Sequence, residues 1–440
     1  MLTVEQNDLL CRVNGDAPMG ALMKRYWLPA CLSDEVSIPG GAPVRSTIVD
    51  TDIVIFRSPK GKLGAIYEYC PHRGASLVLA RNEDDGLRCL YHGWKFAADG
   101  KIVEMPTEPP GSKAKDHLCH DAYPVVESGG FIWVYLGPKE AMPEFKPMPW
   151  ASCPPQRLVI SKVEVDANWA QAMEGQIDSA HSSMLHSTDI PAGRSEQTVV
   201  DARGVHVRPS GEANPKLIVK RVPYGMRYVA VRKPVQNADT QDYMRVTVFM
   251  APCFAFIPPN SRNRLCNITV PRDDHRTAFY FVHYSETTDL DAEMMRKNTG
   301  NTPGVDFDPA TGKRARNRAN NFLQDREAMA KGNFSGIKGI GNQDVAMWES
   351  MGRTPIVDRS KEHLGGTDVA VVQFRRLMLD AMDEFRTSGR VLGQGGPNIP
   401  YSKIRSYEGL VPAGTNWELL GLNDEELAFA AKGAAATAAE

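Results

Sequence analysis

The chain has 440 residues, of which 24% are charged and 42% are hydrophobic, the balance of an ordinary globular protein. Its formal net charge is −2, from 51 basic and 53 acidic residues, so charge does not favour binding to nucleic acid or to a membrane surface. No apolar run reaches the roughly 18 residues that span a bilayer, and the opening MLTVEQNDLL lacks the pattern of a signal peptide. We expect a cytoplasmic protein of two or three domains.

Three segments are expected along the chain. Residues 1–40 contain a predicted helix and the turn RYWLPA, and should pack on the large C-terminal domain. Residues 41–150 should form a small antiparallel β domain that ends at the proline-rich stretches KPMPW and CPP. Residues 151–440 should form the second domain.

Two short loops in the β domain each carry a cysteine and a histidine. Cys70 and His72 lie in CPHRG, and Cys89 and His92 lie in CLYHGW. Such pairs suit a metal, a nucleophile–base pair, or buried cysteines beside surface histidines. Zinc fingers typically pair cysteine with cysteine and histidine with histidine. A Rieske [2Fe–2S] cluster takes two cysteines on one iron and two histidines on the other, so the mixed pairs favour that cluster.

The segment NWAQAMEGQIDSAHSSMLHS places Glu174, Asp178, His181 and His186 close together. Two imidazoles and a carboxylate supply most of a 2-His-1-carboxylate iron site, although a partly amphipathic helix with two incidental histidines would look similar. On an ideal helix His181 and His186 would point about 140° apart, so the helix should kink, bulge or end between them. Asp178 shares a helix face with His181 and is better suited to accept a ring N–H than to bind metal.

Strand-like runs follow from residue 157 onward. RLVISKVEV, KLIVKRV, MRYVAVRK, YMRVTVFM, RLCNITV and TAFYFVHY are rich in β-branched and aromatic residues. They predict an α+β fold with one antiparallel sheet and helices against a face.

One of these strands indicates a substrate-binding wall. In YMRVTVFM, Arg245 lies on a mixed face with Tyr243, Thr247 and Phe249, whereas the other face is wholly aliphatic and should be core. Arg208, in VHVRPS, together with Arg245 could clamp two carboxylates, and Ser179 could add a hydroxyl contact. The alternative is that both arginines are exposed, as arginines usually are.

The third iron ligand must come from elsewhere in the chain. The stretch NQDVAMWESMGRTPIVDRSKEHLG offers Asp344 and Glu349, either of which could instead be a solvated acid. The chain has no Gly-x-Gly-x-x-Gly fingerprint at a strand–helix junction, so we expect a separate reductase to use the nicotinamide cofactor.

The chain resembles the Rieske non-heme iron ring-hydroxylating oxygenases. The resemblance rests on CPHRG with CLYHGW and on the order Asn168-Trp169, Glu174-Gly175, Asp178, His181, His186. It extends from Arg25-Tyr-Trp-Leu-Pro29 to the region of residue 385, and the run from Glu349-Ser350 to His363-Leu364 is similar to the phthalate-dioxygenase-like branch, whose catalytic chains work without a β subunit.

The resemblance implies a Rieske domain and a catalytic domain of the helix-grip type. It implies that Cys70, His72, Cys89 and His92 hold the 2Fe–2S cluster. His181, His186 and Asp344 would hold mononuclear Fe(II), with Glu349 as the alternative carboxylate. Asp178 would bridge to His92 of another protomer, in preference to His72.

The expected activity is cis-dihydroxylation of an aromatic carboxylate of the phthalate or isophthalate type, in aromatic hydrocarbon catabolism. The expected partners are O2, an NAD(P)H-dependent reductase carrying flavin and 2Fe–2S, and further copies in a homotrimer or stacked trimers. Two alternatives remain: monooxygenation or O-demethylation of an aromatic acid with the same metals, and a non-catalytic electron carrier or zinc-stabilised binding protein.

Overall fold

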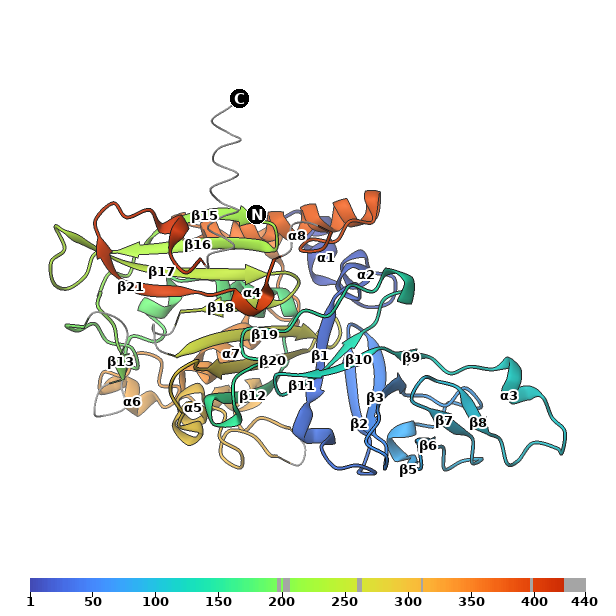
Figure 1. Cartoon of the computed structure of the whole chain (residues 1–440). Helices are drawn as coiled ribbons and strands as arrows, with labels where there is room; N and C mark the ends of the chain where they lie inside the picture. The colour runs from blue at the N-terminus through green and yellow to red at the C-terminus, as the bar shows by residue number, and fades with distance from the viewer. Residues whose placement is uncertain (196–198, 201–205, 259–262, 310–311, 396–398, 423–440) are drawn as a thin grey trace. The chain divides into compact units, whose positions relative to one another are not determined.

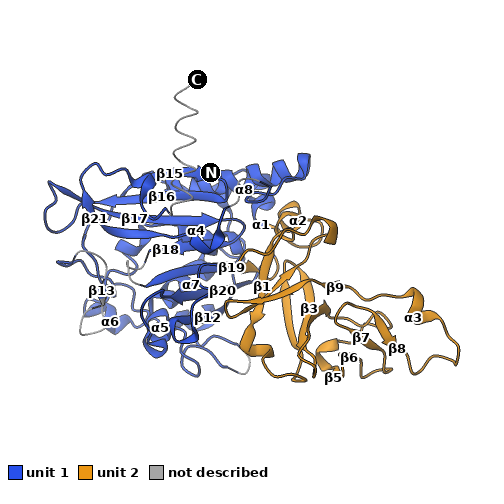
Figure 2. Cartoon of the chain, viewed as in Figure 1, with its two compact units in different colours: residues 1–11, 148–269, 274–440 blue, residues 12–147, 270–273 orange. Residues whose placement is uncertain are grey.

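The computed structural model describes residues 1–195, 199–200, 206–258, 263–309, 312–395 and 399–422. The chain divides into two units (Figure 2). Unit 1 comprises residues 1–11, 148–269 and 274–440, and unit 2 comprises residues 12–147 and 270–273.

Unit 2 is built from three small sheets (Figure 1). The first has the order β1 (Trp27–Leu32), β11 (Phe131–Tyr135) and β10 (Val125–Ser128). The second has the order β2 (Val44–Ile48), β3 (Thr51–Arg57), β4 (Leu63–Tyr67) and β9 (Ala122–Tyr123). The third has the order β5 (Arg81–Glu83), β6 (Gly86–Arg88), β7 (Lys95–Ala97) and β8 (Ile102–Glu104). The neighbouring strands in each sheet pair antiparallel, and two short helices, α2 (Pro18–Met23) and α3 (Ala114–His117), complete the described elements outside 3-10 turns.

Unit 1 contains one large sheet. Its strand order is β12 (Leu158–Val165), β20 (Thr277–Tyr284), β19 (Arg264–Pro271), β18 (Phe254–Ile257), β17 (Gln241–Met250), β16 (Gly225–Arg232) and β15 (Lys216–Val222), and β21 (Tyr407–Pro412) pairs with β17. The short strands β13 (Val199–Val200) and β14 (His206–Val207) form a separate pair. The alternation within β17 appears as predicted: its aliphatic residues Met244 and Val246 are buried in a cluster with Val229, Val411 and Trp417.

Helices pack against the other face of this sheet. α4 (Trp169–Ile177) lies against β18 and α7 (Ile340–Ser350), and α8 (Val369–Ser388) lies against β15 and β16. Phe374 of α8 contacts Phe249 of β17 edge to face, with ring centroids 5.0 Å apart. The mixed face of β17 therefore looks toward the helices. The remaining described helices are α1 (Val4–Cys11), α5 (Ala292–Thr299) and α6 (Arg326–Ala330).

The predicted α+β organisation is confirmed, with an antiparallel β unit and a second unit of one sheet plus helices. The observed boundaries differ from the predicted segment 1–40. Only residues 1–11 belong to unit 1, because β1 pairs with β11 and so places residues 12–40 in unit 2. Among the described residues, no helix has the length and apolar character that crossing a bilayer requires.

Candidate metal centres and substrate cavity

The two Cys-His loops of unit 2 have the same backbone design. Each follows a short strand, β4 or β6, close to the predicted strand-like runs. The Cys70 carbonyl accepts from the Gly74 N–H at 2.8 Å, and the Cys89 carbonyl accepts from the Gly93 N–H at 3.0 Å. Both glycines have φ near +70° (71° and 75°), a conformation that costs glycine little. The Cys70 and Cys89 N–H groups in turn donate to the carbonyls of Ala75 and Trp94, both at 2.9 Å.

These loops bring the four predicted side chains together. Cys70 and Cys89 are buried, free of disulfides and close enough to interact. The ring centroids of His72 and His92 are 4.4 Å apart, and His72 stacks on Trp94 at 4.7 Å. Burial raises the pKa of the Cys70 thiol to about 11, and Nδ1 of His92 is buried without a hydrogen-bond partner in the described chain. Two buried thiols and an orphaned imidazole nitrogen fit a Rieske cluster.

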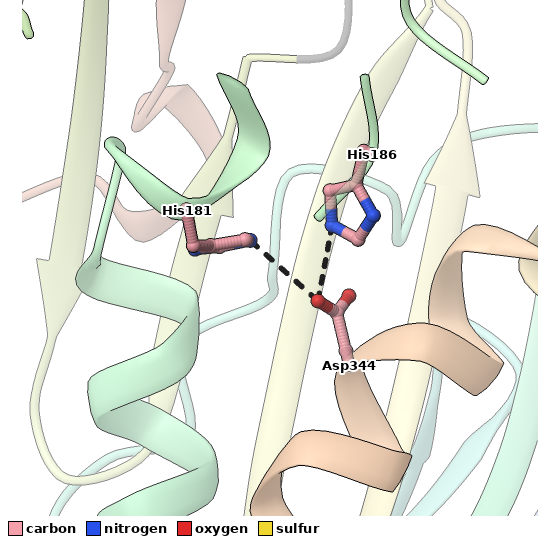
Figure 3. A group of neighbouring side chains, drawn as sticks. All are labelled: His181, His186 and Asp344. Carbon is pink, nitrogen blue, oxygen red and sulfur yellow. Dashed lines mark ion pairs between the residues drawn. The ribbon is translucent and has the colours of Figure 1, made fainter. Parts of the chain in front are cut away.

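A second group of donors lies in unit 1. His181, His186 and Asp344 each offer a ligand atom, and these atoms lie within 4.8 Å of one another (Figure 3). Nε2 of His186 is 3.1 Å and Nε2 of His181 is 3.5 Å from Oδ1 of Asp344. The two imidazoles converge on one carboxylate oxygen, as Figure 3 shows. This donor set fits a 2-His-1-carboxylate iron site.

Each histidine is oriented by a further side chain. Nδ1 of His181 lies 3.6 Å from Oδ2 of Asp178, and the backbone N–H of Ala180 donates to Oδ1 of Asp178 at 2.7 Å. Burial would lower the pKa of His181, but the carboxylates of Asp178 and Asp344 raise it above its ordinary value. Burial would likewise raise the pKa of Asp178, but His181 lowers it. Asp178 is therefore the side chain that orients the His181 ring.

His186 is oriented by Gln343, the residue directly before Asp344. The distance from Nδ1 of His186 to Oε1 of Gln343 is 2.6 Å. Nε2 of Gln343 donates to Oδ2 of Asp189 at 2.7 Å and to the Ile337 carbonyl at 2.8 Å. Because both acceptors need an amide N–H, the Gln343 oxygen faces His186 and assigns the proton to Nδ1. The Nε2 lone pair is then directed toward the position between His186 and Asp344.

The local backbone differs from the expected helix. α4 begins at Trp169, where Asn168 caps it by accepting from the Ala170 N–H, and it ends at Ile177. Asp178 is its extended C-terminal cap (φ −71°, ψ 117°), and His181 lies in a separate 3-10 turn, His181–Ser183. The helix thus ends before both histidines rather than between them, so a turn rather than a helical face brings His181 and His186 together.

The iron-type donors line a cavity that also receives polar residues of the sheet. The lining includes Asp178, Ser179, Arg208, Arg245 and Thr247. Arg208 is 3% exposed and donates through Nε and Nη1 to the Ser210 carbonyl and the Ser182 hydroxyl, both at 3.2 Å. Arg245 donates through Nη1 to Oε1 of Glu408 at 3.0 Å. The hydrogen bonds described here for these two arginines use Nε and Nη1 of Arg208 and Nη1 of Arg245, so Nη2 of each can donate to a ligand.

Glu349, the alternative carboxylate to Asp344, and Glu174 lie elsewhere. Oε1 of Glu349 accepts from the Asp166 N–H at 3.2 Å, and Glu349 is outside the His181–His186–Asp344 group. Burial raises the pKa of Glu349 to about 7. Glu174 is ion-paired with Arg359 at 2.9 Å and with Arg375 at 2.8 Å. Glu174 therefore neutralises buried arginines and does not face the histidines.

Three residues beside this cavity were not predicted from the sequence: Gln343, Glu408 and Arg232. A signal existed for Arg232, because alternation along MRYVAVRK puts Tyr228, Ala230 and Arg232 on one face, and Tyr228 lines the cavity. Gln343 and Glu408 depend on contacts across 157 and 163 residues of chain, which no local pattern reveals.

Comparison with protein families gives two matches. Residues 26–125 match the Rieske [2Fe-2S] domain, and residues 134–438 match the family described as LigXa C-terminal domain like. The second match covers most of the catalytic half, including both histidines and Asp344.

Comparison with individual proteins agrees. The chain is 50% identical over 421 residues to the phthalate 4,5-dioxygenase oxygenase subunit of Pseudomonas putida, covering 95% of this chain and 94% of that protein. It is 34% identical to the 3-chlorobenzoate-3,4-dioxygenase oxygenase subunit of Comamonas testosteroni, covering 95% and 97%. Among solved structures, a Pseudomonas putida CBB5 NdmA mutant with theobromine has a TM-score of 0.57 at 16% identity, covering 86% of this chain and 96% of that one, which shows a shared fold.

Proposed function

Because this chain belongs to the Rieske oxygenases with a LigXa-like C-terminal domain, we propose that it cis-dihydroxylates an aromatic dicarboxylate of the phthalate type. The observation that carries the proposal is the shared cavity: Arg208 and Arg245 line the same space as His181, His186 and Asp344. Arginine forks bind carboxylates through charge-assisted, often bidentate hydrogen bonds. A ring held by two carboxylates would present a fixed edge to the metal site.

The proposed ligand sets follow from the donors described above. Cys70, Cys89, His72 and His92 would hold the 2Fe–2S cluster, and His181, His186 and Asp344 would hold the mononuclear Fe(II). When bound, the cluster supplies single electrons and the mononuclear iron supplies oxygen activation. Because His181, His186 and Asp344 line the cavity, an iron held by them would be accessible to a ligand bound there.

The chain's own residues hold and orient the reactants. Arg208 and Arg245 would fix the substrate's carboxylates, and Ser179 would add a hydroxyl contact from the same cavity wall. Glu408 and the Tyr243 hydroxyl bond Nη1 of Arg245, which restricts that side chain and leaves its Nη2 edge for the ligand. The apolar lining residues Ile257, Leu265 and Phe281 would exclude water around the ring.

Asp178 has a further proposed role as the bridge for electrons between subunits. It contacts His181, and its side chain is 27% exposed. We propose that Asp178 also approaches the cluster histidine His92 of a neighbouring copy, as the resemblance to the family implies. We also propose that the chain forms a homotrimer or stacked trimers and receives electrons from a separate NAD(P)H-dependent reductase with flavin and 2Fe–2S. Its proposed location is the cytoplasm.

The test is oxygen uptake by the holoenzyme with a reductase across phthalate, isophthalate, terephthalate and benzoate. With a dicarboxylate, the oxygen consumed should equal the product formed. With benzoate, oxygen uptake should be weak. Truncating one partner of a buried charge pair commonly costs about 2–5 kcal/mol, so Arg208→Ala should raise the apparent dissociation constant well over tenfold. The proposed substrate class would be refuted if none of the four acids supported oxygen uptake. It would also be refuted if Arg208→Ala and Arg245→Lys left the uptake unchanged.

A further inference from the structure

Arg208 and Arg245 line the cavity, and a third arginine, Arg232, lies near enough to interact with both. Arg232 of β16 pairs in register with Tyr243 of β17, and Ala230 pairs with Arg245. Directly opposed residues on neighbouring strands point to the same face, so Arg232 lies on the same face as Arg245. Burial first, and then the positive charges of Arg208 and Arg245, lower the pKa of Arg232 to about 10.

Of the three arginines, only Arg245 forms an ion pair with a carboxylate of the described chain. Arg245 has Glu408, whereas Arg208 and Arg232 bond neutral groups only. Arg232 is 1% exposed and donates to the carbonyls of Glu212 and Ser179 and to the Ser183 hydroxyl, at 3.1, 2.8 and 3.4 Å. Its Nη1 is buried and has no partner among described residues. Burying a guanidinium without a counter-ion is strongly unfavourable, so an arrangement of this kind is expected to bind an anion.

Arg232 also supports the cavity wall. It is absent from the cavity lining, but it holds the turn that begins at Ser179 through the Ser179 carbonyl and the Ser183 hydroxyl. That turn carries His181 and Ser182, and Ser182 accepts from Arg208. Arg232 is thus a positioning residue whose charge acts on the cavity without touching its contents.

We propose that Arg232 determines the preference of this cavity for dianions. This inference rests on the proposed function: the second carboxylate of an aromatic dicarboxylate supplies the negative charge that Arg208 and Arg232 lack. A monocarboxylate of the same ring would neutralise one arginine and leave the other charge uncompensated. The specificity therefore arises from the charge of a residue behind the wall as well as from the arginines that line it.

The test is equilibrium binding of phthalate and benzoate to the holoenzyme, without reductase, in the wild type and in Arg232→Gln and Arg232→Lys. Removing one charge near a dianion in a low-dielectric site should raise the dissociation constant of phthalate about tenfold or more, and that of benzoate much less. Arg232→Lys keeps the charge, so it should retain most of the wild-type preference.

Arg227→Gln is the matched control. Arg227 lies on the same strand, is 4% exposed and also donates to backbone carbonyls, those of Glu418 and Leu420, but it is opposite Val248 on the aliphatic face. Arg227→Gln should leave the ratio of the phthalate and benzoate dissociation constants unchanged. Iron content should be unchanged in all variants.

Each of the following results would overturn the inference. Equal weakening of both ligands in Arg232→Gln, or a Lys variant as poor as the Gln variant, would reduce Arg232 to a structural support of the turn. A wild type that preferred phthalate, with the same preference in Arg232→Gln, would reject this inference and keep the proposed function. A wild type with no preference for phthalate would reject both.

Discussion

Gln343 accepts a hydrogen bond from Nδ1 of His186 at 2.6 Å, across 157 residues of chain. The same amide donates to Asp189 and to the Ile337 carbonyl, so its orientation is determined from both ends. Gln343 directly precedes Asp344 on α7, and this helix therefore supplies both a proposed ligand and the support of another ligand.

Replacing Gln343 with leucine should weaken iron binding. The variant removes the acceptor that holds the His186 ring, and loss of such a partner typically costs 10–100-fold in metal affinity or activity. The measurement is titration of the iron-depleted mononuclear site with Fe(II), with the visible spectrum of the cluster as an internal control. Wild-type iron affinity in Gln343→Leu would show that His186 needs no support from this residue.

Substitution of a cluster ligand should abolish the visible absorption of the 2Fe–2S centre. Cys70→Ala and His92→Ala each remove one donor from the paired loops, so both should be colourless and inactive. Cys119→Ala is the control, because Cys119 is an exposed free cysteine of the same unit. Full colour in either ligand variant would reject the assignment.

Asp344→Ala should lose mononuclear iron and keep the cluster spectrum. Its Oδ1 is the atom on which both imidazoles converge, and no other carboxylate of the described chain joins that group. Iron analysis of Asp344→Ala beside Glu349→Gln separates the two acids proposed from the sequence. Iron retained in Asp344→Ala and lost in Glu349→Gln would reverse the choice.

Glu349 should make stability depend on pH. Burial raises its pKa to about 7 from an ordinary 4.5. Between these values the folded state holds a proton that the unfolded state has released, so stability falls as pH rises from 4.5 to 7 and stays lower above it. Glu349→Gln should therefore be more stable than wild type at pH 8, by up to about 3 kcal/mol, and similar to it near pH 4.5.

Urea unfolding of both proteins across this pH range checks the prediction. The difference between them should grow as pH rises. A constant difference from pH 4.5 to 8 would mean that the Glu349 carboxyl titrates at its ordinary value.

Local patterns predicted the parts of the site that lie close together in sequence. The mixed Cys-His pairs indicated a cluster because each loop is a complete unit of ligand and turn. Alternation in YMRVTVFM placed Arg245 opposite an aliphatic core face, and the structure places Arg245 on the cavity lining. These inferences need only the period of a strand and the chemistry of the donors.

Features that depend on long-range pairing were missed or misplaced. The pairing of β1 with β11 decides the unit to which residues 12–40 belong, and nothing within RYWLPA specifies its partner strand. Arg232 becomes part of the arginine cluster only through the register of β16 on β17. The end of α4 was misplaced because the extended conformation of Asp178 overrides the helical spacing of Asp178 and His181.

The proposed cis-dihydroxylation is tested most directly by following the oxygen atoms of O2 into the product. The holoenzyme, a reductase and phthalate are incubated under ¹⁸O₂, and the product is analysed by mass spectrometry. We expect a cis-dihydrodiol of phthalate that carries two labelled oxygen atoms. A product with one labelled oxygen, as in monooxygenation, or oxygen uptake without any hydroxylated product, would contradict it.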